Sequence, residues 1–149
     1  MSKQFISPPA TVFAAVTDIP RTPERIPEIK KIEMLTEGPI GLDTKFQETR
    51  IMFGKEAVET FEIVEFIQDR LMTMVAVSCG AEYRVEHRFH ADGAGTRMEL
   101  ELQIRARSFY AKLFRPLGWL MRGMMKKGIA KDLDRLAAAV DGKQAQPVF

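Results

Sequence analysis

The sequence predicts an α+β fold in which an antiparallel sheet packs against one long C-terminal helix. Four turn signals divide the segment from Thr44 to Ala106 into five strands, and they lie at Gly54-Lys55, Gln68-Asp69, Cys79-Gly80 and Asp92 to Gly95. Pairing the strands across these turns gathers most of the apolar side chains on one face. The C-terminal segment supplies an apolar helical stripe that is expected to cover this face.

The N-terminal segment predicts a strand, two short helices and a second strand. Lys3 to Ile6 has the length of a short strand, and Ser7 is expected to cap a helix that begins at Pro8. Three prolines interrupt the chain after this helix and allow at most one more short helix, around Thr22 to Arg25. A strand from Lys30 to Thr36 follows and ends at a turn rich in glycine and proline.

The turns also predict which side chains share a face. A two-residue turn at Gly54-Lys55 places Arg50 opposite Glu59 and Glu48 opposite Phe61. The other turns set Phe66 opposite Leu71, Ser78 opposite Ala81 and Ala91 opposite Thr96. Because side chains alternate along a strand, the predicted inner face carries Phe46, Glu48, Arg50, Met52, Ala57, Glu59, Phe61, Ile63, Met72, Met74, Ala76, Ser78, Tyr83, Val85, His87, Phe89, Met98, Leu100, Leu102 and Ile104. Several valines of the middle strands fall on the outer face, which leaves a bulge or an oligomer contact as explanations.

The C-terminal segment predicts the covering helix. Its apolar stripe consists of Leu117, Leu120, Met121, Met124, Gly128, Leu133, Leu136, Ala137 and Val140. Pro116 indicates either a kink or a separate first piece near Ser108 to Phe114. The tail from Gly142 to Phe149 is expected to be disordered, so residues 1–141 form the predicted single domain.

Composition limits the classes of protein that this chain can represent. With 149 residues, 46% of them hydrophobic, it fits one domain. No apolar run approaches the ~20 residues that cross a bilayer, and the first residues lack the apolar centre of a signal peptide. The single cysteine, Cys79, cannot form an internal disulfide. We therefore expect a cytoplasmic protein.

Charge is distributed unevenly along the chain. Residues 1–104 hold 12 Lys and Arg against 17 Asp and Glu, whereas residues 105–149 hold 10 against 3. The basic C-terminal segment favours an acidic partner or an anionic membrane surface, although a solvated helix face is the usual explanation. Aromatic residues are not interleaved with the basic ones as in a nucleic-acid-binding module, so no nucleic-acid partner is expected.

Four segments carry a resemblance to a known family: PPATVFAAVTDIPRTPERIPEI, GPIGLDTKFQETRIMFGKEAVETFEI, GAGTRMELEL and KDLDRLAAAV. They cover nearly the whole chain, and it resembles the START-like (SRPBCC) superfamily in its bacterial polyketide cyclase/dehydrase and lipid-transport branch. The resemblance implies a helix-grip fold, with a curved antiparallel sheet of six to seven strands wrapped around the C-terminal helix. It also implies an apolar cavity that binds lipids, polyketides, sterols, quinones or plant-hormone-like molecules. Many members are not enzymes, and none of the four segments is a catalytic signature. Leu42-Asp43 stands where relatives often have a second glycine, which affects only a turn.

The candidate ligand-binding residues lie on the inner faces of the predicted sheet and helix. They are Glu48, Arg50, Glu59, Phe61, Met72, Met74, Tyr83, His87, Leu100, Leu102, Leu117, Met121 and Met124. The charged trio is either a structural ion network or a polar anchor. In an anchor, one glutamate accepts hydrogen bonds from the ligand, or Arg50 clamps a ligand carboxylate. His87 is either a neutral core residue or a proton carrier, and the sheet register places it away from the trio.

These observations predict a protein that binds a lipid, a polyketide or a quinone-like molecule and needs no cofactor. Methionines on both faces give an adaptable lining that favours a ligand. The first alternative is a cyclase or dehydratase in which His87 or a glutamate moves protons while Arg50 stabilises an enolate. The second is a partner protein whose basic helix docks on a membrane or a macromolecular complex. The other histidine, His90, is predicted to point outward, so no metal site is expected. A monomer or a homodimer is expected.

Overall fold

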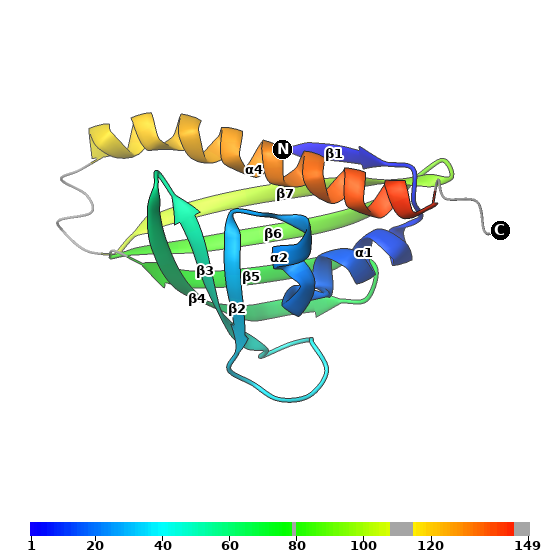
Figure 1. Cartoon of the computed structure of the whole chain (residues 1–149), viewed down its shortest axis with the longest axis horizontal. Coiled ribbons are helices and arrows are strands. Elements are labelled where there is room, and N and C mark those ends of the chain that lie inside the picture. Colours follow the sequence, from blue (N-terminus) through cyan, green and yellow to red (C-terminus); the bar gives the residue numbers. More distant parts are fainter. Residues whose placement is uncertain (79, 108–114, 145–149) are drawn as a thin grey trace.

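An antiparallel sheet of seven strands curves around the C-terminal helix α4 (Figure 1). The computed structural model describes residues 1–78, 80–107 and 115–144, with the side chains of 115–121 and 143–144 left aside. Strands occur in the order β1-β7-β6-β5-β4-β3-β2, so the chain forms a meander that the N-terminal strand extends at the β7 edge. The predicted α+β class, with its sheet and long C-terminal helix, is confirmed.

The elements follow the predicted order. They are β1 (Ser2–Phe5), α1 (Pro9–Thr17), the 3-10 turn η1 (Ile19–Arg21), α2 (Thr22–Arg25), β2 (Ile29–Met34), β3 (Lys45–Met52), β4 (Lys55–Ile67), β5 (Leu71–Ser78), β6 (Ala81–Asp92), β7 (Gly95–Ala106) and α4 (Arg115–Gln144). The short helix predicted at Thr22 to Arg25 is present at those residues. α4 extends to Gln144, three residues beyond the expected domain boundary. The predicted helical piece at 108–114 and the end of the predicted tail lie outside the described residues.

The β3–β4 turn lies one residue before the predicted one, which shifts the pairing of the two strands by two residues. Phe53 and Gly54, not Gly54 and Lys55, form the turn, with φ angles of 53° and 75°. This is the backbone geometry that a two-residue hairpin with the sheet's own twist requires. Glu48 consequently faces Glu59, and Arg50 faces Ala57. The predicted register was wrong, but a shift of two residues leaves every side chain on its predicted face.

The other hairpins show where turn signals alone were sufficient. Ser78 pairs with Ala81 and Ala91 pairs with Thr96, as predicted. Phe66 pairs with Met72 rather than with Leu71, because Ile67 pairs with Leu71 and the turn contains three residues, 68–70. A bulge in β4 between Ile63 and Glu65 then restores the predicted register, so that Ile63 pairs with Met74. That bulge is one of the two explanations offered for the outward valines. A contact with a second copy of the chain stays a prediction.

Strong curvature gives the sheet its concave side. In Figure 1, β5, β6 and β7 run roughly along α4, whereas β2 and β3 cross beneath it. The change of direction falls across β4, the strand that contains the bulge. The hairpin of β3 and β4 is thereby brought up toward α4.

The packed core lies where α1 and the C-terminal half of α4 meet the sheet. Phe13 of α1 lies between Phe66 and Phe89, with ring centroids 5.2 Å away in both cases. Leu133, Leu136, Ala137 and Val140 of α4 join this cluster. The C-terminal half of α4 therefore packs against the sheet, whereas its residues 122–128 are mostly exposed.

Ser7 holds the C-terminal part of α4 and does not cap α1. The cap position of α1 is Pro8, and no side chain accepts a hydrogen bond there. The Ser7 hydroxyl instead donates to Asp141 Oδ1 at 2.7 Å, and Asp141 also accepts from the backbone N–H groups of Ile6 and Ser7. Ser7 is fully buried, so this carboxylate satisfies donors that water cannot reach.

Candidate ligand-binding cavity

A cavity of about 290 Å³ lies between the concave side of the sheet and α4. Its apolar lining includes Val16, Ile19, Phe46, Met52, Phe61, Met72, Met74, Val85, Met98, Leu100, Leu102, Met125, Ile129, Leu133 and Leu136. Its polar and charged lining includes Thr22, Arg25, Glu48, Arg50, Glu59, Tyr83, His87 and Asp132. An apolar wall with a few polar groups, at the lower end of the usual volume range of about 300–1,000 Å³, is typical of a small-molecule site.

A wider groove of about 920 Å³ runs along the outside of the molecule between β7 and α4. It shares Leu100, Leu102, Met125 and Ile129 with the cavity, but its outer wall carries charged side chains such as Glu101 and Arg122. Because this groove is lined by several charged side chains, the smaller and more apolar cavity is the better candidate for an apolar ligand.

The cavity brings together all the candidate residues predicted on the sheet. These are Glu48, Arg50, Glu59, Phe61, Met72, Met74, Tyr83, His87, Leu100 and Leu102. The sheet register had indicated that His87 lies apart from the charged trio, yet curvature places both in the wall of one cavity. Contact of these residues with a ligand stays a prediction.

The helix residues were predicted less well. Met124 is 51% exposed and lies outside the lining, so its assignment to the site was wrong. Met125, Ile129, Asp132 and Leu136 line the cavity instead. Their spacing of four, three and four residues defines one helix face, and each residue turns the helix by about 100°. The side chains of Leu117 and Met121 lie outside the described residues.

Arg50 is held between β3 and α4 by two carboxylates. Its Nε lies 2.9 Å from Glu48 Oε1, and its Nη2 donates to Asp132 Oδ2 at 3.0 Å. All three side chains are at least three-quarters buried. Asp132 was missed by the sequence reasoning. The sequence does show that Asp132 follows Ile129 by three residues and precedes Leu136 by four. This spacing places an acidic side chain on the same helix face as these two apolar residues.

Glu59 gives this cluster a surplus of negative charge. It faces Glu48 directly across the β3–β4 pair and lines the cavity. Within the described part of the chain, Glu59 makes no hydrogen bond or ion pair. Burial raises the pKa of Glu48, and Arg50 opposes this shift, whereas Glu59 and Asp132 add to it. Three carboxylates and only one guanidinium of this cluster therefore lie in the cavity wall.

His87 is a second polar group in the wall. It is 7% exposed, and its Nδ1 has no hydrogen-bond partner among the described residues. Burial lowers the pKa of His87 to about 4, and the backbone of Met72 on the adjacent strand offsets this shift only in part. The imidazole is therefore neutral at pH 7 and offers one donor and one acceptor.

We expect the imidazole of His87 to titrate near pH 4 in the folded protein. Its folded pKa lies below the ordinary value of 6.5. Between these two values the unfolded chain binds a proton at His87 more readily than the folded protein does. The free energy of unfolding is therefore unaffected by His87 above about pH 6.5 and decreases as the pH falls toward 4. Histidine ring NMR measures this directly, with the His87→Asn variant assigning the resonance. A midpoint near 6.5 would show that water reaches the ring freely.

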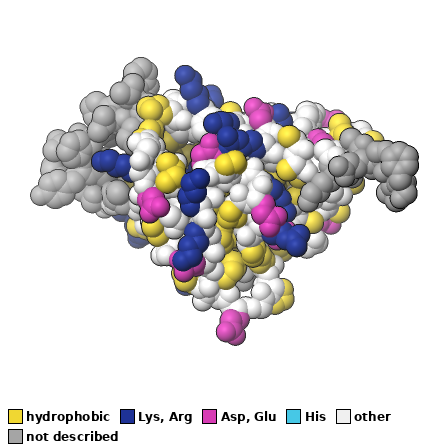
Figure 2. Space-filling view, viewed as in Figure 1, with side chains coloured by type: hydrophobic (Ala, Val, Ile, Leu, Met, Phe, Trp, Pro, Cys, Tyr) yellow, Lys and Arg dark blue, Asp and Glu magenta, His cyan; other side chains and the backbone are white. Residues whose placement is uncertain are grey.

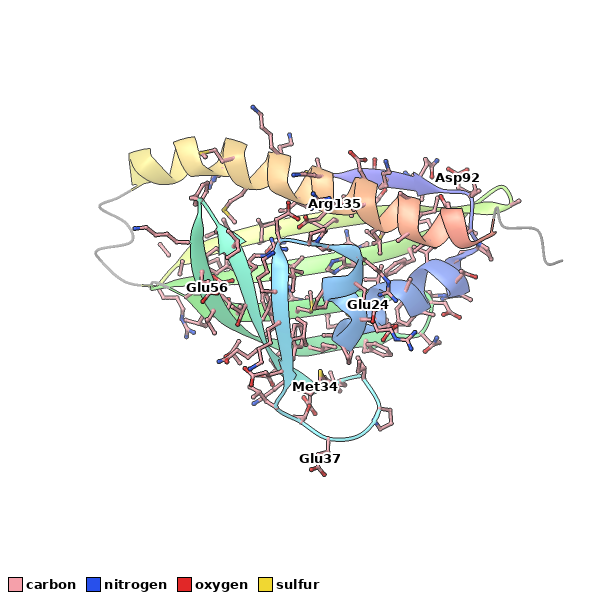
Figure 3. The ribbon with its side chains drawn as sticks, in the orientation of Figure 1. Glu24, Met34, Glu37, Glu56, Asp92 and Arg135 are labelled. Atoms are coloured by element: carbon pink, nitrogen blue, oxygen red, sulfur yellow. The ribbon has the colours of Figure 1, made fainter. Side chains whose placement is uncertain are left out.

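Ion pairs also join α4 to the connection between α2 and β2. Glu28 accepts hydrogen bonds from Lys131 Nζ at 3.2 Å and from Arg135, and Figure 3 labels Arg135 where α4 passes this connection. The space-filling view shows basic side chains interspersed with acidic and apolar ones over this side (Figure 2). A membrane or macromolecular partner for the basic residues stays a prediction.

The described residues contain neither a candidate metal site nor a helix apolar enough to span a membrane. No group of three or more His, Cys, Asp and Glu side chains is arranged to hold a metal ion. In the same residues, even α4 contains no stretch apolar enough to cross a bilayer.

The curved sheet, the C-terminal helix and the cavity between them define a helix-grip protein of the START-like class. The chain belongs to the family described as polyketide cyclase / dehydrase and lipid transport, whose model matches residues 2–141. The resemblance seen in the sequence is confirmed. Comparison with curated proteins finds no match.

Solved structures share the fold at low sequence identity. Ara h 8.0201 is 18% identical, with a TM-score of 0.75 and 94% of each chain covered. The Zhui aromatase/cyclase from Streptomyces sp. R1128 is 13% identical, with a TM-score of 0.73 and coverage of 94% of this chain and 90% of that one. The di-domain aromatase/cyclase StfQ of the steffimycin biosynthetic pathway is also 13% identical, with a TM-score of 0.77, and the match covers 97% of this chain and 50% of StfQ. These likenesses establish the fold alone.

Proposed function

We propose that this protein binds a hydrophobic small molecule, a lipid, a polyketide or a quinone-like compound, between the sheet and α4. The observation that supports this most directly is the cavity of about 290 Å³. Protein interiors are close-packed, so a mostly apolar hollow of this size is not expected of a core built for packing alone. An apolar ligand would fill it and keep its apolar surface away from water.

The lining also supports an irregular or variable apolar ligand. Met52, Met72, Met74, Met98 and Met125 all line the cavity. Methionine side chains are unbranched and polarizable, and they adapt to shapes that branched side chains cannot follow. A core built only for packing is better specified by leucine, isoleucine and valine.

Native mass spectrometry of the gently purified protein tests this proposal. We expect a co-purified apolar molecule, and after its removal we expect saturable binding of the uncharged probe phenylnaphthylamine. The Met125→Trp variant places a bulkier side chain in the cavity and should weaken both signals. Met124→Trp places the same side chain on the exposed face and should leave both unchanged. Equal binding by the two variants, or no binding by the wild type, would contradict the proposal.

A second candidate function is catalysis of a cyclisation or dehydration. It is favoured by the presence of Arg50, Tyr83 and His87 in the wall of the same cavity. A neutral His87 accepts a proton, and a guanidinium stabilises a developing enolate oxygen. The masses of the molecules that co-purify with the wild type and with His87→Ala distinguish the candidates. A dehydratase retains an unreacted substrate in the variant, heavier by one water, whereas a binding protein yields the same mass from both.

A further inference from the structure

We propose that the ligand carries a hydrogen-bond-donating or cationic polar group, such as a hydroxyl or an amine, and that Glu48 and Glu59 receive it. This inference rests on the proposed function and specifies the chemical class of the ligand. It decides between the two possibilities that the sequence left open for the charged trio. The alternative, a ligand carboxylate clamped by Arg50, is disfavoured by the contacts of the site.

Arg50 already lies against two carboxylates. Glu48 approaches its Nε from β3, and Asp132 accepts from its Nη2 across the gap to α4. A ligand carboxylate would have to displace one of these partners and leave that carboxylate unpaired in a mostly apolar wall. Breaking a buried ion pair in this way is strongly unfavourable. The guanidinium is therefore a structural link between sheet and helix.

The second arginine of the lining is also committed. Arg25 Nη2 donates to Asp18 Oδ2 at 2.9 Å, and its Nη1 donates to the backbone oxygen of Ala15 at 2.7 Å. The guanidinium of Arg25 therefore binds these partners and makes no ion pair with Glu59. Both arginines of the cavity wall therefore already have carboxylate partners.

Glu59 is the charged group of the cavity wall that is available to bind a ligand. It lies opposite Glu48, it faces the cavity, and it has no partner among the described residues. Two carboxylates side by side repel each other, and this repulsion is relieved by a cation or by donors placed between them. An amine or a hydroxyl supplies such donors and keeps its apolar body against the methionines.

An independent observation supports a ligand with polar groups in this cavity. The imidazole of His87 lines it, is more than nine-tenths buried, and has an Nδ1 without a partner among the described residues. An unsatisfied buried nitrogen is unfavourable and calls for a ligand or a water. Because the ring is neutral, it also offers no positive charge to a carboxylate.

Three probes of equal chain length test the inference: decylamine, decanol and decanoate. Their affinities for the ligand-free protein are measured by calorimetry at pH 7. We expect the amine and the alcohol to bind roughly tenfold tighter than the carboxylate or better, which is the effect of about 1.4 kcal/mol. Glu59→Gln should reduce the preference for the amine over the carboxylate by about the same factor, since it removes one unpaired charge.

Glu56→Gln is the matched control. Glu56 lies on the same strand as Glu59, three residues earlier, and its side chain is exposed on the outer face of the sheet (Figure 3). This variant has the same change in net charge and should leave the preference unchanged. An equal loss in both variants would mean that the protein's overall charge, not the cavity, selects the amine, and would overturn the inference.

The remaining outcomes separate this inference from the proposed function. Equal binding of the three probes, or tightest binding of decanoate, overturns the inference and leaves the hydrophobic ligand site standing. Binding of none of them, together with no binding of phenylnaphthylamine, contradicts the proposed function and the inference with it. Binding of the uncharged probe alone overturns only the inference.

Discussion

Replacing Arg50 with methionine is expected to lower the free energy of unfolding by about 3 kcal/mol at pH 7. Methionine keeps much of the volume of the side chain but leaves Glu48 and Asp132 without their cation. Removing one partner of a buried ion pair costs about 3–5 kcal/mol. We take the lower end because the arginine side chain is 25% exposed. Urea unfolding with an unchanged m-value measures the loss.

The pH dependence of this loss identifies its origin. The pKa of Glu48 is already raised by burial, so the folded state favours its protonated form. A carboxyl group with a raised folded pKa destabilises the folded state least at a pH below its ordinary pKa. It destabilises the folded state increasingly as the pH rises. The loss in Arg50→Met should therefore shrink as the pH falls from 7 toward 4.5. An equal loss at both pH values would indicate that packing, not charge, is responsible.

Arg84→Met is the control for Arg50→Met. Arg84 forms an ion pair with Glu65 at 2.7 Å on the outer face of the sheet, where both side chains are about a third or more exposed. Surface pairs of this kind contribute about 0–1 kcal/mol. A comparable loss in the two variants would contradict the special role of the cavity cluster.

Replacing Gly95 with alanine is expected to destabilise the protein by about 3 kcal/mol. A Cβ atom at this position would lie 2.2 Å from the backbone oxygen of Phe5. Phe5 pairs with Thr96, so the clash separates β1 from β7 next to the packed core. Overpacking against backbone costs about 1–3 kcal/mol, because no flexible side chain is available to move away. Thermal and urea unfolding both measure the effect.

Gly128→Ala is a control for which we expect the free energy of unfolding to change in the opposite direction. Gly128 lies inside α4, and a Cβ atom there would meet nothing within 4 Å. Alanine in an exposed helix interior is about 1 kcal/mol more favourable than glycine. We therefore expect a gain in stability from this variant. A Gly95→Ala variant as stable as the wild type would show that β1 shifts freely.

The inner face of the sheet was predictable because it depends only on the parity of the register. The turn at Phe53 and Gly54 lies one residue before the predicted one, which shifts the pairing by two residues. Glu48, Arg50 and Glu59 therefore remain on the concave face. A shift by one residue would have placed Glu59 on the opposite face from Glu48 and Arg50.

The rotation of α4 about its axis was not predictable to one residue. Met124 and Met125 are both compatible with an apolar stripe, and only packing against the sheet decides which of them faces inward. The structure places Met125 in the cavity and exposes Met124. Asp132 was missed for the same reason, because its inward position depends on that rotation.

The sequence by itself determined the fold class, the order of the elements and the faces of the strands, because these follow from local turn chemistry and from the alternation of side chains. Only the tertiary structure decided which partners meet. Arg50 and Asp132 are 82 residues apart, and Ser7 and Asp141 are 134 apart. Contacts at such separations depend on the bend of the sheet at the β4 bulge and on the placement of α4, and no local pattern records either of these.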